Sequence, residues 1–129
     1  MEIKSSYLVD SHCHLNFKDF NDDFEKVLLR AQESNVRVMV SISTELDEID
    51  KIINISEKHD NIYCTVGVHP HSTNIDNQID EDFLEKKSKN SNVIGIGETG
   101  LDFYYENSKK EDQIKSFKKH INVSRNTQL

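Results

Sequence analysis

The sequence predicts an α/β protein built as half of a (β/α)8 barrel of the TIM type, with parallel strands inside and helices outside. Short apolar runs alternate with longer amphipathic stretches along all 129 residues, and this alternation is typical of βαβ units in a parallel sheet. A closed barrel of eight units usually needs about 250 residues. The chain has room for about four units, so we expect residues 1–129 to form a single partial-barrel domain.

Four apolar runs predict the strands of this half-barrel. They are residues 7–15 (YLVDSHCHL), 36–43 (VRVMVSIS), 62–69 (IYCTVGVH) and 93–98 (VIGIGE). Each run is short and bounded by polar stretches, as strands covered by helices are. Active sites of this architecture lie at the C-terminal ends of the strands, so the residues that end the four runs are the candidates for function.

The amphipathic stretches after the strands predict helices, because their apolar residues recur every three or four positions. The predicted helical stripes consist of Phe20, Phe24, Val27, Leu28 and Ala31, then Leu46, Ile49, Ile52 and Ile53, then a weaker helix over residues 81–89, and finally Ile114, Phe117 and Ile121 in a helix over residues 111–123.

The chain ends at Leu129, where we expect a fifth strand to begin.

Composition narrows the class of protein further. The net charge of −7 argues against nucleic-acid binding through bulk positive charge, although metal ions can supply that charge locally. No apolar run is long enough to span a membrane, and the polar start of the chain lacks the apolar core of a signal peptide, so we expect a cytoplasmic protein. Cys13 and Cys64 are too few for a disulfide framework, and we expect two buried free thiols.

The first candidate site is the Asp10-Ser11-His12-Cys13-His14 segment at the end of the first strand. Alternate residues of a strand share a face, so Asp10, His12 and His14 are expected on one face and Cys13 on the other. Two imidazoles so placed can converge on one metal ion. The alternative is a surface histidine pair in the loop after the strand.

The second candidate site is the Gly-rich end of the fourth strand. Counting by twos places Ile94, Ile96 and Glu98 on one face, and it leaves Gly95 and Gly97 on the other, where they would let a helix pack close to the sheet. Glu98 would then stand at the rim, where a carboxylate can bridge two cations. The alternative is a glycine-rich turn with a solvated glutamate. A dinucleotide fingerprint is not favoured, because that fingerprint belongs to the first βα turn and these glycines follow the fourth predicted strand.

The third candidate site is the Gly67-Val68-His69-Pro70-His71 segment. His69 ends the third strand and is a candidate to contact a phosphate or to order a water molecule. We expect His71 to be solvent-exposed. His59 and His120, on helical stretches, are expected to be surface residues.

Taken together, residues 10–14, 67–71 and 95–102 (GIGETGLD) resemble the first half of the TatD-type deoxyribonuclease family, in order and in approximate spacing. The resemblance covers essentially the whole chain. It implies a (β/α)8 barrel that uses up to two divalent cations, whether magnesium, manganese or zinc, to hydrolyse phosphodiester bonds of DNA.

The resemblance also implies roles for individual residues. His12 and His14 are expected to ligate one metal ion, and Glu98 is expected to be a ligand placed to bridge a pair of ions. His69 matches a histidine at the mouth of the family's site, and Asp102 matches the family motif. Both are assigned to substrate binding, and no residue is assigned as the catalytic acid or base.

The ligands that complete the family's site lie on later strands, beyond Leu129. We therefore expect weak binding of one cation, poor DNA hydrolysis by the chain alone, and association either with itself or with a C-terminal half-barrel partner. An inactive fragment or a half-barrel binding module is one alternative, and gel-filtration mass with a nuclease assay would distinguish it. An amidohydrolase-type enzyme is another, since such enzymes also begin with H-x-H but more often place a lysine where Glu98 stands.

Overall fold

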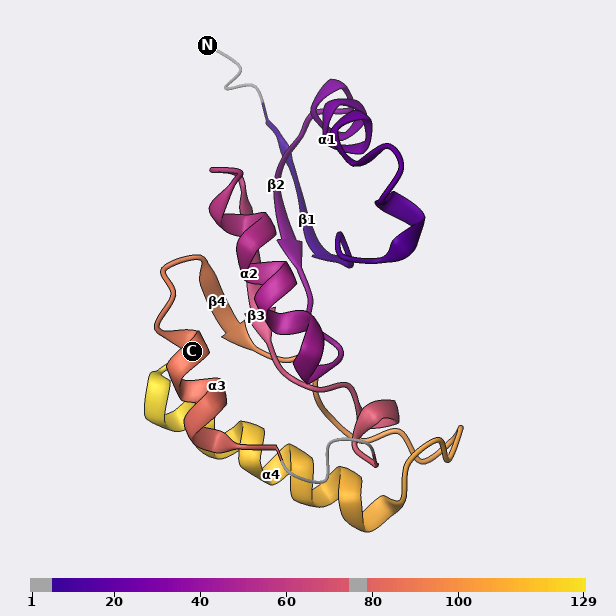
Figure 1. The fold of residues 1–129 in the computed structure, drawn as a ribbon, viewed down its shortest axis with the longest axis vertical. Coiled ribbons are helices and arrows are strands. Elements are labelled where there is room, and N and C mark those ends of the chain that lie inside the picture. Colours follow the sequence, from indigo (N-terminus) through magenta and orange to yellow (C-terminus); the bar gives the residue numbers. More distant parts are fainter. Residues whose placement is uncertain (1–5, 75–78) are drawn as a thin grey trace.

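The computed structural model describes residues 6–74 and 79–129; the polar start of the chain at residues 1–5, on which the signal-peptide argument depends, lies outside them. Four parallel strands form one sheet in the order β1-β2-β3-β4 (Figure 1). The predicted half-barrel fold is confirmed. The strands are β1 (Leu8–Cys13), β2 (Val36–Ser41), β3 (Ile62–Val66) and β4 (Val93–Ile96), the helices are α1 (Phe24–Glu33), α2 (Ile49–Glu57), α3 (Glu81–Ser88) and α4 (Lys110–Thr127), and short 3-10 turns lie at η1 (Lys18–Phe20), η2 (Leu46–Glu48) and η3 (Pro70–Ser72).

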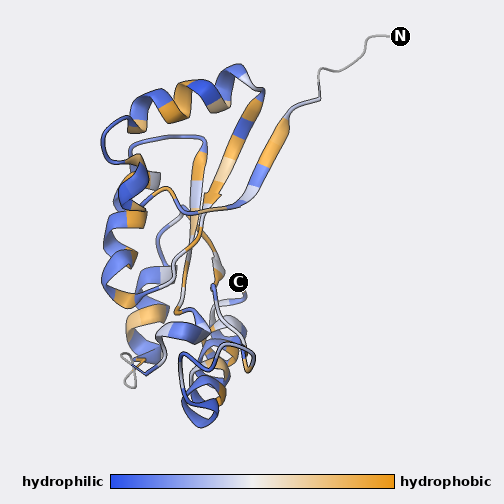
Figure 2. Ribbon diagram, turned by 90° about the vertical axis from the view of Figure 1, so that its right-hand side faces the viewer, coloured by the Kyte–Doolittle hydropathy of each residue, from blue (hydrophilic) through white to orange (hydrophobic). Residues whose placement is uncertain are grey.

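The helices lie along one side of the sheet, and the other side carries no helix among the described residues (Figures 1 and 2). Two apolar clusters fill the space between sheet and helices. The larger joins α2, α3 and α4 to β3 and β4, and the smaller packs α1 against β1 and β2. On β1, Leu8 and Val9 are 60% and 51% exposed, so much apolar surface of the sheet faces solvent.

Strand β3 alternates regularly between buried and half-buried side chains. Ile62, Cys64 and Val66 are buried, whereas Tyr63 and Thr65 between them are only half-buried. Complete burial of a side chain such as Ile or Val stabilises a fold by roughly 1.5–3 kcal/mol, so this strand anchors the centre of the half-barrel.

Strand β4 departs from simple alternation because its pairing with β3 contains a shift. Cys64 lies opposite Val93 and Thr65 lies opposite Gly95, so Ile94 has no opposite residue. Ile94 is 46% exposed, whereas Ile96 packs against the larger apolar cluster. The predicted shared face of Ile94 and Ile96 is therefore wrong, because the extra residue of a β-bulge moves the following side chains to the opposite face.

Helix α4 buries a face that the apolar pattern does not mark. Its predicted stripe is largely in solvent, since Ile114 and Ile121 are 40% and 42% exposed. The prediction of the buried face was wrong because polar side chains of this helix bond to neighbouring loops. The buried residues of α4 are Gln113, Ser116, His120 and Val123.

Within the described residues, no helix has both the length and the apolar character to cross a membrane.

Candidate metal centre

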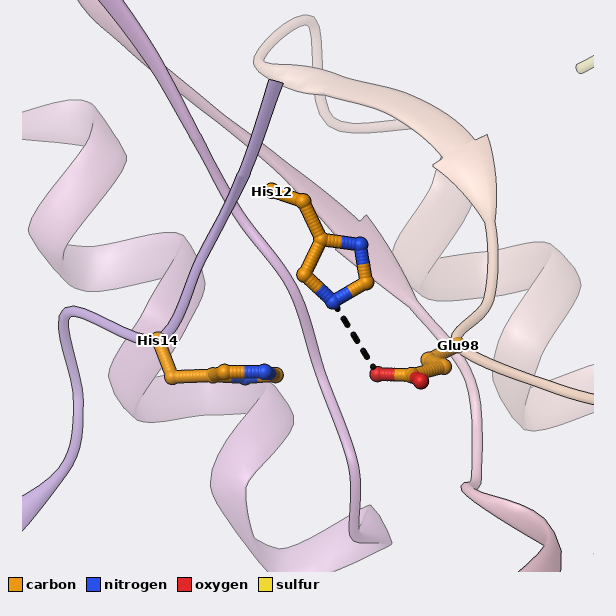
Figure 3. A group of neighbouring side chains, drawn as sticks. All are labelled: His12, His14 and Glu98. Carbon is orange, nitrogen blue, oxygen red and sulfur yellow. Dashed lines mark ion pairs between the residues drawn. The ribbon is translucent and has the colours of Figure 1, made fainter. Parts of the chain in front are cut away.

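The C-terminal ends of the two outer strands bring three potential metal ligands together. His12 lies at the end of β1, His14 follows it, and Glu98 follows β4 (Figure 3). One ligand atom from each residue lies within 4.8 Å of the others. The predicted convergence of these three side chains is confirmed, although their assignment as metal ligands stays a prediction.

Backbone hydrogen bonds join the segments that follow the strands and hold the ligands in place. The Glu98 N–H donates to the Ser43 carbonyl at 2.9 Å, and the His69 N–H donates to the Thr44 carbonyl at 2.8 Å. The Ile42 N–H donates to the carbonyl of Cys13, also at 2.8 Å. Each site residue is thus positioned by the segment after β2, at the centre of the rim.

Two neighbouring segments approach each other closely at this rim, and a glycine makes this approach possible. A Cβ on Gly67 would lie 2.6 Å from backbone atoms of Gly97, so only glycine fits there. A Cβ on Gly95 would meet the Thr65 methyl group at 3.4 Å, and none of the nearest atoms around Gly95 or Gly97 belongs to a helix. The prediction that these two glycines admit a helix was therefore wrong.

The hydrogen bonding of His14 leaves one ring nitrogen free to bind a cation. Its Nδ1 lies 3.0 Å from the Ile42 carbonyl oxygen, which can only accept, so Nδ1 carries the proton and Nε2 keeps its lone pair. The ring also stacks on Phe17 with centroids 4.6 Å apart. Such a bond to the second nitrogen orients metal-bound histidines and sets their tautomer.

His12 and Glu98 face each other directly. The His12 Nε2 lies 3.3 Å from a Glu98 carboxylate oxygen (Figure 3). Asp10, which alternation places with the histidines, is not in the three-membered group found among the described residues. Its carboxylate accepts a hydrogen bond from the His12 N–H at 3.1 Å, and the register of β1 with β2 shifts between Asp10 and Cys13.

His69 approaches the other oxygen of Glu98, with its Nε2 at 3.5 Å. Its Nδ1 accepts a hydrogen bond from the His71 N–H at 3.1 Å, so the neutral ring carries its proton on Nε2 and presents a donor to the site. Burial lowers the pKa of His69, and the nearby Glu98 opposes this shift. A neutral ring with a donor on Nε2 suits an anionic oxygen, and its substrate contact stays a prediction.

His71 and Asp102 form a close pair beside the candidate metal centre. The His71 Nε2 lies 2.6 Å from an Asp102 carboxylate oxygen, and both side chains are half-buried. The other carboxylate oxygen accepts hydrogen bonds from the N–H groups of Tyr104 and Tyr105 at 3.0 and 3.3 Å. The bond to His71 is the main cause that lowers the pKa of Asp102. The expectation that His71 is exposed was wrong, and substrate binding by Asp102 stays a prediction.

Two buried residues of α4 that the sequence analysis missed position the loops of the site. The His120 Nε2 accepts a hydrogen bond from the Val68 N–H at 3.0 Å, and its Nδ1 donates to the Ser116 carbonyl at 2.8 Å. The Gln113 amide accepts from the Asp102 N–H at 2.7 Å and donates to the Asp102 carbonyl at 2.9 Å. His120 is 1% exposed, so its assignment to the surface was wrong.

A stripe of mainly polar residues at helical spacing could have indicated this buried face of α4 from the sequence. Gln113, Ser116, His120 and Val123 recur every three or four positions, as the side chains of one helix face do. Burial lowers the pKa of His120, in agreement with a neutral ring that uses both nitrogens. His59 is half-buried as well, with its side chain 22% exposed, so its assignment to the surface was also wrong.

The two cysteines are free thiols, as expected, although only Cys64 is fully buried. The half-buried Cys13 donates to the Val40 carbonyl at 3.4 Å, and burial raises its pKa to about 12. Burial also raises the pKa of Cys64. Neither cysteine belongs to the group of potential metal ligands found among the described residues.

The donor set fits a divalent cation. Two nitrogens and one carboxylate oxygen are typical ligands of zinc and related ions, with bonds of about 2.0–2.2 Å. Two atoms on opposite sides of one ion are then at most about 4.4 Å apart, so the observed spread of up to 4.8 Å would contract slightly around a bound ion. His12, His14 and Glu98 would hold the ion and leave coordination positions open.

Fold and site together define a partial (β/α)8 barrel with a His-His-carboxylate group at the C-terminal ends of its strands. The family model for TatD related DNase matches residues 9–129, so the chain belongs to that family. This result confirms the resemblance recognised in the sequence motifs.

Similar proteins show how much of a family member this chain represents. An uncharacterized metal-dependent hydrolase, YcfH of Escherichia coli K12, is 34% identical over 122 residues, which are 92% of this chain and 45% of that protein. An uncharacterized metal-dependent hydrolase of Buchnera aphidicola subsp. Baizongia pistaciae is 33% identical over 121 residues, with the same two shares. The crystal structure of YJJV, a TatD homolog from E. coli K12, superposes with a TM-score of 0.87 at 23% identity, over 95% of this chain and 48% of that one. The chain thus spans about half the length of the relatives it matches.

Proposed function

We propose that this chain supplies the N-terminal half of the active site of a divalent-metal-dependent hydrolase that cleaves phosphodiester bonds of DNA. The observation that carries the proposal is the convergence of His12, His14 and Glu98 within 4.8 Å at the C-terminal rim. The family description names a DNase, and the curated relatives carry the name of metal-dependent hydrolases. The cytoplasmic location expected from the sequence remains part of the proposal.

Each residue of the site has a defined task in this proposal. A bound divalent cation neutralises the negative charge that develops on a phosphodiester during hydrolysis. His14, oriented by the Ile42 carbonyl, presents a lone pair on Nε2. The two carboxylate oxygens of Glu98 face different histidines. The His12 Nε2 lies 3.3 Å from one oxygen, and the His69 Nε2 lies 3.5 Å from the other. His69 keeps a proton on Nε2, with which it would donate to a phosphate oxygen.

We also propose that a second half-barrel, equivalent to the C-terminal half of the relatives, completes the site. The relatives are about twice as long as this chain, and the open edges of β1 and β4 are where further strands would pair. Exposed Leu8, Ile94 and Ile121 would then be covered. Pairing with a second copy of this chain would add only another His12, His14 and Glu98 set.

Calorimetric titration of the chain with manganese and with zinc tests the metal site. We expect one cation to bind weakly, and we expect His12→Ala and His14→Ala to lose that binding, since two remaining donors hold a cation poorly. His59→Ala is the matched control, because it removes an imidazole from α2's C-terminal side, outside the three-residue group. Identical isotherms for the wild type and His14→Ala would contradict the proposal.

A nuclease assay on protein of verified mass tests the activity. We expect little cleavage of DNA by the monomer, and chelator-sensitive cleavage once a C-terminal half is present, because two-metal hydrolysis requires both cations to be held. Strong cleavage by the monomer that Glu98→Ala abolishes would show that the half-site suffices. A folded chain that binds no metal and does not become active with a C-terminal half would favour the binding-module alternative.

A further inference from the structure

The exposed apolar side chains of this chain gather on two flanks of the half-barrel. The leading flank consists of β1 and α1, and the trailing flank consists of β4, α4 and the loop between them. Among the described residues, no large apolar side chain is exposed on the elements between the flanks, β2, α2, β3 and α3. Apolar residues that gather in this way mark an interaction surface, whereas scattered ones require no explanation. The leading flank exposes Leu8, Val9 and Leu29, and the trailing flank exposes Ile94, Leu101, Ile114 and Ile121.

Each flank also ends the sheet with an unpaired strand. The strand order is β1-β2-β3-β4, so β1 and β4 each have an open edge (Figure 1). Such an edge presents backbone groups that can pair with another strand. Parallel sheets are almost always covered on both faces, whereas every residue of β1 from Leu8 to His12 is exposed. Both flanks therefore have the properties of an interface.

A second copy of the chain fits the two flanks through a two-fold rotation about the barrel axis. The four parallel strands form half of a (β/α)8 barrel, and a barrel of this type closes with eight parallel strands. The rotation places β1 of each copy beside β4 of the other and keeps all eight strands parallel. A head-to-tail contact of this kind forms a ring when the rotation closes, and here it closes at two copies with no strand edge left open.

Charge favours the same pairing. Helix α4 contains five basic and two acidic residues, whereas residues 19–25, which lead into α1 and begin it, contain four acidic residues and no basic one. The rotation places α4 of each copy beside α1 of the other, because each helix lies outside its own strand in the ring of helices. The trailing flank is thus basic in a chain whose net charge is −7, and opposite charges across an interface favour association.

The same rotation brings each Glu98 next to the histidines of the other copy. Within one chain, Glu98 lies 3.3 Å from His12 although β2 and β3 separate β1 from β4. In the pair, β1 of the second copy lies directly beside β4, at the spacing of about 4.8 Å between neighbouring strands. His12 and His14 of the second copy therefore stand at the end of the strand next to Glu98. Each carboxylate faces two pairs of imidazoles, one from each copy.

We propose that two copies of this chain associate through their flanks, close an eight-stranded barrel and share their metal-binding groups at one mouth. The association goes beyond the proposed function, because it depends on the flanks and requires neither a metal ion nor a C-terminal half. A C-terminal half would compete for the same two flanks.

Light scattering on size-separated protein tests the association. We expect the metal-free wild type to have twice the mass of one chain and to form no larger species, because the closed ring uses both flanks of each copy. Leu29→Lys and Ile121→Lys should each raise the dissociation constant of the pair by roughly tenfold or more, because a charge on either flank opposes association. Both residues are exposed, at 54% and 42%, so circular dichroism should show that the variants fold as the wild type does.

Asn54→Lys is the matched control. It adds the same charge at an exposed position of α2, between the flanks, and should leave the mass unchanged. A wild type that stays monomeric as its concentration rises, or that forms open chains of growing mass, would overturn the inference. A monomer that pairs only with a C-terminal half would do so too, and would assign both flanks to that half.

Mixed variants test the shared metal groups. A copy with both His12→Ala and His14→Ala keeps Glu98, and a copy with Glu98→Ala keeps the two histidines. Neither copy alone should bind manganese in calorimetry, whereas an equimolar mixture should recover binding where Glu98 of one copy meets the histidines of the other. Native mass spectrometry verifies that the mixed pair forms, and a mixed pair that binds no manganese would overturn the sharing.

The two measurements separate this inference from the proposed function. A wild type that forms the pair but binds no manganese contradicts the proposed metal site and leaves the association standing. A monomeric wild type that binds manganese through His14 contradicts the association and leaves the metal site standing.

Discussion

Gly67→Ala is expected to destabilise the protein and to open the candidate metal centre. The new Cβ would lie 2.6 Å from the Cα and carbonyl carbon of Gly97, whereas 3.4 Å is the lower limit of ordinary contact. The two segments must therefore separate by about 0.8 Å, and both contacts involve backbone. Overpacking of this kind typically costs about 1–3 kcal/mol, which lowers the melting temperature by roughly 3–5 °C for each kcal/mol in a domain of this size.

The separation also acts on the site, because Gly97 precedes Glu98. We expect the gap between His69 and Glu98, now 3.5 Å, to widen and manganese affinity to fall. Thermal unfolding followed by circular dichroism, together with calorimetry, measures the two effects.

Gly95→Ala is the control, since its Cβ would meet only the Thr65 methyl group at 3.4 Å. We expect that variant to unfold close to the wild-type temperature. Equal melting temperatures for Gly67→Ala and wild type would refute the reasoning.

Two further predictions concern the residues that position the loops. Replacing His120 by Phe should cost about 1–3 kcal/mol, because the Val68 N–H loses its buried acceptor. Burial keeps the pKa of His120 below its ordinary value of 6.5. The contribution of His120 to stability is therefore full above pH 6.5 and is lost as the pH falls through the folded-state pKa. Urea unfolding midpoints measured at pH 7.5 and 5.5 should differ more in the wild type than in this variant. Gln113→Leu should speed hydrogen exchange at the Tyr104 and Tyr105 amides, which report on the loop held at Asp102, and unchanged exchange would show that Gln113 does not hold it.

The architecture was predictable because it depends on patterns that persist over many residues. Four apolar runs separated by amphipathic stretches determine four βα units, and parallel strands bring their C-terminal ends to one edge. The sequence analysis placed Glu98 at this rim by counting alternate residues along the fourth strand, and that count fails at Ile94. His12, His14 and Glu98 still lie together, because each lies at or just after the C-terminal end of a parallel strand.

What the sequence could not reveal depends on single-residue shifts and on polar pairs distant in sequence. A bulge moves the following side chains to the other face, and a one-residue change in register leaves no signal in the apolar pattern. His71 and Asp102 meet across a separation of 31 residues, and Val68 meets His120 across 52. Hydrogen bonds of this kind bury polar residues that composition alone assigns to the surface.

The unmatched residue in β4 affects how insertions and deletions act on this chain. Ile94 has no opposite residue on β3, while Gly95 and Ile96 lie opposite Thr65 and Val66. A chain that lacked Ile94 would keep the pairing of Gly95 and Ile96 with β3. Glu98 would still lie two residues after the end of the strand. A one-residue gap at this place in an alignment of relatives therefore does not move the carboxylate, whereas a gap between Ile96 and Glu98 does.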